Sequence, residues 1–519
     1  NLTDALSYNV GATAMHVDLD RDFEGYIYIA NLLTAIAQGT YNFIDPSANT
    51  QAQMDFVRPA KRVTATSDQY ELRADVTGRF FDLPGGPLQV GVGGSVRYES
   101  INAPSANPDT AGPTQRYFGI NAFGTSGSRY IYSAYGELEA PIMSIVTLNV
   151  AGRFDHYSSG QSNFSPKAGI KIEPFRGLLI RGTYSEGFRI PSFGEANALP
   201  TTGFVGNGPS LFNDAFLAQY GCTVATFSSC PTYIRSGSYG QTTLASPDLD
   251  PEKSRSFTAG IFYEPIRNLT FSLDYYNIKK TGLIVQPSNS PALQAYYNNQ
   301  PIPAGYTVIP DSTDPNFPNA KPRVGFVQSQ LINANTQRTQ GLDGSIDGRI
   351  NFGPNFSLNT QLSATYIIKL ETEFPDGTVE RYDGTLGNFN LTAGSGTPKW
   401  HGYWLNSFQF GDGFQLNATV NYFDKYNLSA MDQGDDYKDC GQNPGYSPVG
   451  CDVDSYITVD LQAAMKVNDQ FTFRLTMLNA FDRLPPIDVA TYGAYLYNPV
   501  QGGQGILGRT FKASVSAEF

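Results

Sequence analysis

The chain ends in the stretch Thr510-Phe511-Lys512-Ala513-Ser514-Val515-Ser516-Ala517-Glu518-Phe519, in which apolar and polar residues alternate. Successive side chains of a β-strand point to opposite faces, so this strand has one apolar face and one polar face. The apolar face carries Phe511, Ala513, Val515, Ala517 and Phe519, and the polar face carries Lys512, Ser514, Ser516 and Glu518. Such a strand suits a sheet with lipid on one side and water on the other.

The same alternation recurs along the chain, most clearly from Tyr70 to Phe80. One face of this stretch carries Leu72, Val76 and Phe80, which we predict to face lipid, and the other carries Arg73, Asp75 and Arg79. Charges at every second position suit the water-filled or plugged lumen of a barrel. Because lipid cannot satisfy an open sheet edge, the sheet must close. We therefore predict an all-β fold, a transmembrane antiparallel β-barrel.

Composition agrees with this fold and excludes other classes. No stretch approaches the roughly 18 apolar residues that a transmembrane helix needs. Aromatic residues make up 13% of the 519 residues, with 32 Tyr and 34 Phe against 2 Trp, which favours strands and interfacial girdles. The net charge is −12 without a basic stripe, so nucleic acid is not expected as a partner.

The strands are separated by connections that are alternately short and long, as in barrels with periplasmic turns and extracellular loops. We predict about sixteen strands, an even number that puts both chain ends on the periplasmic side. They lie near 6–20, 62–82, 88–103, 128–142, 143–157, 163–175, 178–192, 253–266, 269–285, 329–352, 356–374, 396–411, 414–427, 455–468, 471–485 and 508–519. Long loops lie near 21–61, 104–127, 193–252, 286–328, 375–395, 428–454 and 487–507, with a short helix expected at Tyr26–Gln38.

The cysteines form two close pairs, Cys222 with Cys230 and Cys440 with Cys451, each within a polar loop. Two disulfides on the cell surface are predicted, since none of the three histidines is near enough to complete a zinc site. The acidic run Asp432–Asp439 offers oxygen ligands for calcium but lacks EF-hand spacing, so a solvated loop is the preferred interpretation and no metal site is predicted.

Several motifs resemble those of TonB-dependent outer-membrane receptors. They are Phe81–Gly93, Tyr135–Pro141, Gly152–Ser158, Arg181–Ser192, Pro247–Ser254 and Leu478–Asp482, in the family's order over essentially the whole chain. Two of them, around Phe188–Pro191 and Pro247–Leu249, are similar to the boxes that flank a haem-ligating histidine in some receptors. No histidine lies between residues 157 and 400, so no haem or other cofactor is expected.

The resemblance implies more structure than these residues hold. Such receptors have a barrel of roughly 22 strands with a plug inside it. Here the match begins within the barrel, so the plug and the first strands are expected to come from a missing N-terminal segment or a companion chain. The strand near Leu6–Asp20 should then pair on one side with sequence not included here. A self-closed barrel of about sixteen strands is the alternative.

Candidate ligand-binding residues lie in the lumen and the longest loops. Arg181 and Arg189 share the lumen face of one strand, where they could contact a plug or an anionic ligand or could pair with carboxylates such as Glu137 and Glu139. Aromatic residues crowd the loops and could either line a ligand mouth or pack on one another. The candidates among them are Phe204, Tyr220, Tyr233, Tyr239, Tyr296 and Tyr297.

The resemblance implies a receptor in the outer membrane of a Gram-negative bacterium that imports a scarce nutrient: a siderophore, cobalamin, oligosaccharide or peptide. Its expected partners are outer-membrane lipid, the barrel-assembly machinery, and the TonB–ExbB–ExbD complex acting through the plug. A passive porin-type channel and a surface binding or adhesion barrel are the alternatives. The sequence contains no nucleophile elbow, histidine pairing or phosphate loop, so no enzyme is predicted.

Overall fold

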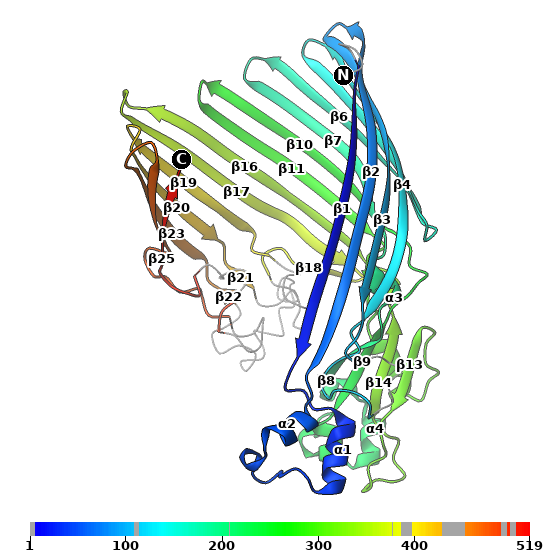
Figure 1. Ribbon diagram of the computed structural model, residues 1–519. Helices are drawn as coiled ribbons and strands as arrows, with labels where there is room; N and C mark the ends of the chain where they lie inside the picture. The colour runs from blue at the N-terminus through cyan, green and yellow to red at the C-terminus, as the bar shows by residue number, and fades with distance from the viewer. Residues whose placement is uncertain are drawn as a thin grey trace.

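The computed structural model describes residues 6–107, 114–206, 208–375, 377–385, 397–427, 452–488, 496–498 and 505–518. One antiparallel sheet of sixteen long strands and the short β18 forms a tall curved wall (Figure 1). The strands are β1 (Leu6–Phe23), β2 (Lys61–Leu83), β3 (Gly86–Ala103), β4 (Thr125–Met143), β5 (Val146–Tyr157), β6 (Ser162–Phe175), β7 (Leu178–Arg189), β10 (Glu252–Ile266), β11 (Leu269–Thr281), β16 (Thr336–Asn351), β17 (Phe356–Glu373), β18 (Val379–Arg381), β19 (Trp400–Phe410), β20 (Phe414–Phe423), β23 (Tyr456–Lys466), β24 (Phe471–Leu478) and β25 (Thr510–Ala517).

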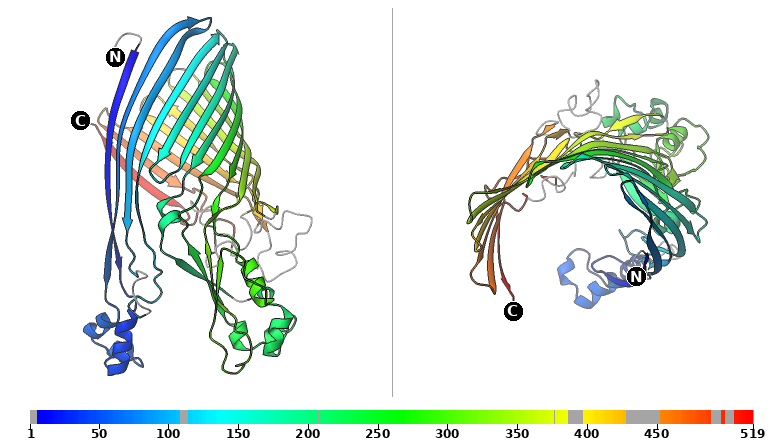
Figure 2. Two further views of the ribbon diagram at one scale, coloured as in Figure 1. Left: turned by 90° about the vertical axis from the view of Figure 1, so that its right-hand side faces the viewer. Right: turned by 90° about the horizontal axis from the view of Figure 1, so that it is seen from above.

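Each long strand pairs with the next long strand in the chain. In the part of the chain that the structure describes, β1 pairs only with β2 and β25 only with β24, so the wall is open between these two edges (Figure 2). The predicted antiparallel sheet of about sixteen strands is confirmed. No helix among the described residues is long and apolar enough to cross a bilayer.

Four strands end three or more residues earlier than the alternation predicts. One is β20, which ends at Phe423 instead of near 427. In the other three, a residue that interrupts the ladder follows the last paired one. β7 ends at Arg189, two residues before Pro191, which has no N–H to donate. β11 ends at Thr281 because Gly282 has a positive φ of 65°. β24 ends at Leu478 because Asn479 also has a positive φ, of 49°. The predicted strand that ends near 285 therefore breaks into β11 and the short β12.

One face of the wall is apolar and bounded by aromatic side chains. Near the extracellular ends of the strands, Tyr70, Tyr98 and Tyr130 lie side by side on β2, β3 and β4, with ring centroids 6.3 and 5.0 Å apart. At the short turns of the other end, a row of neighbouring rings continues from strand to strand, and these are Phe352, Phe356, Phe410 and Phe414. Two girdles of this kind mark the two surfaces of an outer membrane.

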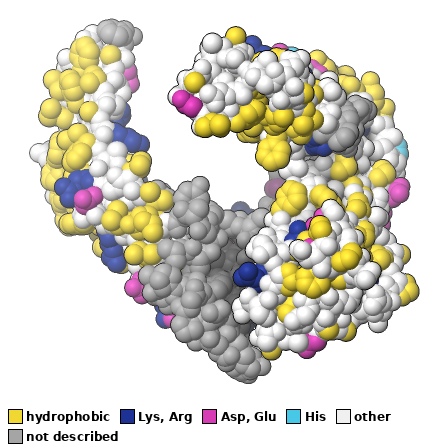
Figure 3. Space-filling view, turned by 90° about the horizontal axis from the view of Figure 1, so that it is seen from below, with side chains coloured by type: hydrophobic (Ala, Val, Ile, Leu, Met, Phe, Trp, Pro, Cys, Tyr) yellow, Lys and Arg dark blue, Asp and Glu magenta, His cyan; other side chains and the backbone are white. Residues whose placement is uncertain are grey.

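Leu72, Val76 and Phe80 lie between the levels of these girdles on β2. Leu72 and Phe80 are 58% and 63% exposed, which agrees with the predicted lipid-facing set. The eleven residues from Tyr70 to Phe80 span about 33 Å of strand, enough for an apolar band about 25 Å tall when the strand is tilted. Figure 3 shows hydrophobic side chains along the outside of one arm of the wall. We call this face the outward face.

The other face is polar, and its side chains pair across strands. Asn9 donates to Asp75 over 3.2 Å, and the hydroxyls of Ser7 and Thr77 lie 2.7 Å apart. Arg181 on β7 forms an ion pair with Asp274 on β11, with 2.7 Å between Nη2 and Oδ2. Such pairs satisfy charges on a surface that lines a lumen.

The long connections fold beyond the extracellular girdle. The loop between β1 and β2 contains α1 (Ile29–Gln38), η1 (Pro46–Ala48) and α2 (Gln51–Val57), so the helix expected at Tyr26–Gln38 is present. Two further loops, 190–251 and 282–335, form one unit that we call the loop domain. The elements of the first loop are α3 (Phe193–Asn197), β8 (Thr201–Gly206), η2 (Pro209–Leu211), α4 (Asp214–Leu217), η3 (Ala218–Tyr220), η4 (Phe227–Ser229), α5 (Thr232–Arg235) and β9 (Ser238–Leu244). Those of the second are β12 (Ile284–Val285), α6 (Ser290–Tyr297), β13 (Tyr306–Pro310), β14 (Val324–Gln330) and β15 (Ile332–Asn333).

The loop domain is held together by a small sheet in the order β13-β14-β9-β8, in which β9 and β14 are parallel. The parallel pair joins the two loops, which are separated by β10 and β11 in the sequence. A short hairpin, β21 (Tyr426–Asn427) with β22 (Asp452–Val453), lies elsewhere in the extracellular region.

Candidate functional site

The core of the loop domain is aromatic. Phe216 stacks on Phe212 and meets Tyr297 edge-on, with ring centroids 5.5 and 4.6 Å away. Tyr220 and Tyr297 are almost fully buried, at 2% and 4% exposure. The remaining buried side chains of this core are Leu217, Cys222, Cys230, Ile234, Tyr239, Ala292, Leu293, Tyr296, Val324 and Val327. Aromatic packing of this size gives two long loops a hydrophobic centre of their own.

The tyrosine hydroxyls of this core hold one loop against the other. Tyr220 donates to the carbonyl of Lys321 over 2.7 Å, and Tyr233 donates to the carbonyl of Ser312 over 2.7 Å. A third hydroxyl acts within the second loop, where Tyr296 on α6 donates to the carbonyl of Pro322 over 2.8 Å. Burial raises the pKa of Tyr296 to about 12, so this hydroxyl keeps its proton at physiological pH.

The aromatic candidates named from the sequence therefore fall into two groups. Tyr220, Tyr239, Tyr296 and Tyr297 are buried in the loop domain and Tyr233 is partly buried there, so these tyrosines pack on neighbouring loop residues. Phe204 on β8 is 68% exposed, and its ring lies 6.1 Å from that of Phe326 on β14. Ligand contact by any of these residues stays a prediction.

A disulfide joins Cys222 and Cys230 within this core, as predicted. It closes a short loop that carries η4, next to Leu217 and Ile234. The second predicted disulfide, Cys440 with Cys451, and the acidic run Asp432–Asp439 lie outside the described residues.

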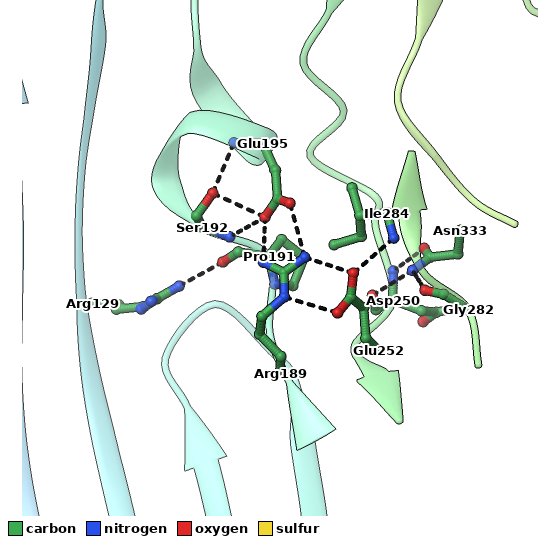
Figure 4. Close-up of polar contacts among 10 residues, drawn as sticks. All are labelled: Arg129, Arg189, Pro191, Ser192, Glu195, Asp250, Glu252, Gly282, Ile284 and Asn333. Atoms are coloured by element: carbon green, nitrogen blue, oxygen red, sulfur yellow. Dashed lines mark hydrogen bonds and ion pairs between the residues drawn. The ribbon is translucent and has the colours of Figure 1, made fainter. Parts of the chain in front are cut away.

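Arg189 is the centre of a polar cluster where the loop domain meets the wall (Figure 4). Its guanidinium donates to both oxygens of Glu252, the first residue of β10, over 2.9 and 2.6 Å. It also donates to both oxygens of Glu195 on α3, over 2.7 and 2.9 Å. Glu195 and Ser192 form a reciprocal capping box that begins α3. The cluster thus joins the end of β7, the first helix of one loop and the start of β10.

The same cluster reaches the second loop. Glu252 accepts a hydrogen bond from the backbone N–H of Ile284 in β12 over 2.8 Å. Asn333 in β15 donates to the carbonyls of Asp250 and Gly282 over 2.8 and 2.9 Å. Residues from both loop bases are therefore fixed to one another where they leave the wall (Figure 4).

The cluster is expected to weaken in acid. Burial works to raise the pKa of Glu195 and of Glu252. The hydrogen bonds from Arg189, together with those from Ser192 to Glu195 and from Ile284 to Glu252, outweigh burial and lower the pKa of both. Because the folded pKa lies below the ordinary 4.5, the stabilisation is complete above pH 4.5 and is lost as pH falls through the lower folded value. The protection factors of the amides at Ile284 and in α3, corrected for the intrinsic exchange rate at each pH, should fall below pH 4.5. In Arg189→Met they should already be low at neutral pH and change little in acid.

Arg181 does not belong to this cluster. Its ion pair with Asp274 crosses over Gly260 on the intervening strand β10. The pairing suggested from the sequence with Glu137 and Glu139 is wrong, because those residues are on β4, three strands away from β7 in the sheet. The alternation predicted that these residues share the inner face, but it did not predict how many strands separate them from Arg181.

Gly260 should tolerate no side chain without loss of this ion pair. A Cβ built at Gly260 would collide with the Asp274 carboxylate and lie 3.1 Å from Nε of Arg181. We expect Gly260→Val to reduce the stability of the wall by about 1–2 kcal/mol, discounted for the solvent around Arg181. The midpoint of urea unfolding followed by tryptophan fluorescence measures the change. Gly182→Val, at an outward position where the nearest atom to the added Cβ is 3.7 Å away, serves as the control.

Glu195, Glu252 and Asn333 were not identified from the sequence. The spacing of Ser192 and Glu195 is that of a capping box, and this signal could have identified Glu195. No local sequence signal could have placed Glu252 or Asn333 beside Arg189, because their positions depend on how β10 and β15 lie against β7.

Comparisons with known proteins agree with this architecture. A sequence model of the family described as "TonB dependent receptor-like, beta-barrel" matches residues 2–480. No curated protein sequence is similar enough to match the chain.

Solved structures of similar fold include the siderophore receptor PirA from Acinetobacter baumannii, with a TM-score of 0.60 and 15% identity over 99% of this chain and 60% of that one. A mutant of the ferric enterobactin receptor PfeA from Pseudomonas aeruginosa, in complex with enterobactin, has a TM-score of 0.60 and 14% identity over 99% and 60% of the two chains. The outer membrane transporter YddB from Escherichia coli has a TM-score of 0.58 and 14% identity over 100% and 61%.

At these identities the structures show the fold, and this chain spans about 60% of their length. The family is one of receptors rather than enzymes, and its members lie in the outer membrane of Gram-negative bacteria, which agrees with the two aromatic girdles. With the match extending over nearly the whole wall, the chain belongs to the family of TonB-dependent receptor β-barrels.

Proposed function

We propose that this chain is the barrel part of an energy-coupled transporter that imports a scarce nutrient across the outer membrane. The observation that carries the proposal is the pairing of an apolar outward face with a charged, ion-paired inner face in a chain of this family. The extracellular loops would capture the ligand, and energy would come from TonB, ExbB and ExbD acting on a plug outside these 519 residues.

The gap between the edges of β1 and β25, which we call the seam, supports the proposal that further polypeptide pairs with these edges. A sheet edge in lipid leaves backbone N–H and C=O groups without partners, at a cost of several kcal/mol each. We propose that further strands close the seam and that a plug fills the lumen, both supplied by an N-terminal segment or a companion chain. The barrel-assembly machinery would insert the completed wall.

The substrate belongs to one of four classes: siderophore, cobalamin, oligosaccharide or peptide. We propose to test ferric siderophores first, because the PirA and PfeA structures of similar fold are siderophore receptors. Among the candidate residues, Phe204 is best placed to contact such a ligand, since its ring is largely in solvent beside Phe326.

Uptake measurements test the proposal. Cells that express the complete protein should accumulate a radiolabelled substrate of one of these classes, and deletion of TonB should abolish the accumulation. Accumulation that persists without TonB would instead support a passive porin-type channel. Saturable surface binding with no uptake in either strain would support a binding or adhesion barrel.

A further inference from the structure

A group of basic residues lies on the outward face at the extracellular ends of β10 and β11. Lys253 and Arg255 share this face with Phe257, and Lys279 lies opposite Arg255 on the neighbouring strand. All three basic side chains are exposed. Tyr184 of β7 lies opposite Phe257, so the basic residues begin two positions beyond the last aromatic residues of the lipid-facing band.

These residues surround a hollow of about 370 Å³ where two strands separate. β6 begins at Ser162 and β7 continues to Arg189, but they pair only as far as Lys167 and Ser185. Beyond that point Asn163 and Phe164 of β6 form one wall of the hollow, while Lys253, Arg255 and Lys279 lie across from them. A second hollow, of about 560 Å³, adjoins it and shares Lys253.

The balance of charge in the first hollow is positive. In the part of the chain that the structure describes, its one carboxylate is Glu186, which lies 3.3 Å from Nε of Arg255 and accepts a hydrogen bond from Tyr184 over 2.6 Å. Among the described residues, no carboxylate comes within ion-pair distance of Lys253 or Lys279. Asp250 lines the adjoining hollow and leaves the sum positive. A surface with this excess of positive charge attracts an anion such as phosphate.

On the same face there is also an apolar hollow of about 480 Å³, which lies over β3 to β7. Its floor includes Gly136 and Gly152, which pair across β4 and β5, and its walls include Val92, Leu138 and Phe164. The Phe164 ring lies against Gly152, while Gly136 has no side-chain or backbone atom close above it and leaves room for a hydrocarbon chain against the strands. Phe164 lines both this hollow and the basic one, so the two adjoin at this ring.

We propose that these hollows bind a phosphorylated acyl lipid of the outer leaflet. Its phosphate would contact Lys253, Arg255 and Lys279, and one acyl chain would lie over Gly136 beside the Phe164 ring. The order of the two hollows matches the orientation of such a lipid, with the charged group beyond the aromatic girdle and the chain within the apolar band. The site is on the outside of the wall and is separate from any path for a nutrient.

Native mass spectrometry of the complete, delipidated protein tests the proposal, with lipid A, dephosphorylated lipid A and inorganic phosphate as separate probes. We expect lipid A to bind, and the triple variant Lys253→Gln, Arg255→Gln, Lys279→Gln to lose affinity by about tenfold or more, as for two or three charge-assisted contacts in partial solvent. Its control, with the same change in net charge, is Lys171→Gln, Lys466→Gln, Lys512→Gln.

A second variant tests the acyl contact. A Cβ at Gly136 would lie 3.8 Å from its nearest neighbour, so Gly136→Leu fits the fold and fills the apolar hollow. It should lower the affinity for lipid A while the basic residues remain in place. Equal binding of lipid A and its dephosphorylated form, or equal losses in the triple variant and its control, would overturn the proposal. So would inorganic phosphate binding as tightly as lipid A, because the site would then bind the free ion.

Discussion

Replacing Val76 with arginine should prevent most of the protein from assembling in the outer membrane. Val76 lies on the outward face of β2, between the levels of the two aromatic girdles. An arginine near the middle of the bilayer on a lipid-facing position costs about 2–4 kcal/mol. Such a loss is a large part of the stability of a typical folded domain. The amount of folded protein in purified outer membranes, read from its heat-dependent mobility on gels, measures the effect.

Thr77→Arg is the matched control, because Thr77 is the next residue and lies on the inner face beside Ser7. Arginine there remains in a polar environment, so assembly should be close to that of the unmodified protein. If both variants assemble equally well, or Thr77→Arg alone fails, the register of β2 is the reverse of the one described.

Removing the Cys222–Cys230 disulfide should destabilise the loop domain by about 2–3 kcal/mol, the value expected for a cross-link that closes a loop of this size. Both cysteines are buried against the aromatic core, so the double change to serine also places two hydroxyls there. Amide exchange in α5 and α6 should become faster by tenfold or more, while exchange in β2 and β3 stays unchanged.

Two comparisons separate the disulfide from the serine substitutions. Mild reduction of the unmodified protein should reproduce the faster exchange in α5 and α6. Cys440→Ser with Cys451→Ser, in a different loop, should leave these helices protected. Unchanged exchange in α5 and α6 after verified reduction would show that the aromatic core alone holds the two loops together.

The sequence by itself determined the wall of this protein. Alternation with a period of two specified which side chain of each strand faces lipid, since a shift of one residue would move every apolar side chain to the wrong side. Leu72 and Arg73 are therefore placed by the pattern alone. The short turns, such as the one between β5 and β6, follow from local chemistry in the same way.

Only the tertiary structure decided what lies across the sheet and above it. Arg181 meets Asp274 because Gly260 leaves room between them, and Arg189 meets Glu252 because β10 returns beside β7. The loop domain depends on parallel pairing of β9 with β14 and on aromatic contacts between loops far apart in sequence. Such contacts produce no periodic pattern in the sequence. A tyrosine buried in a loop and a tyrosine that binds a ligand can have the same neighbours in the sequence, because only their tertiary contacts differ.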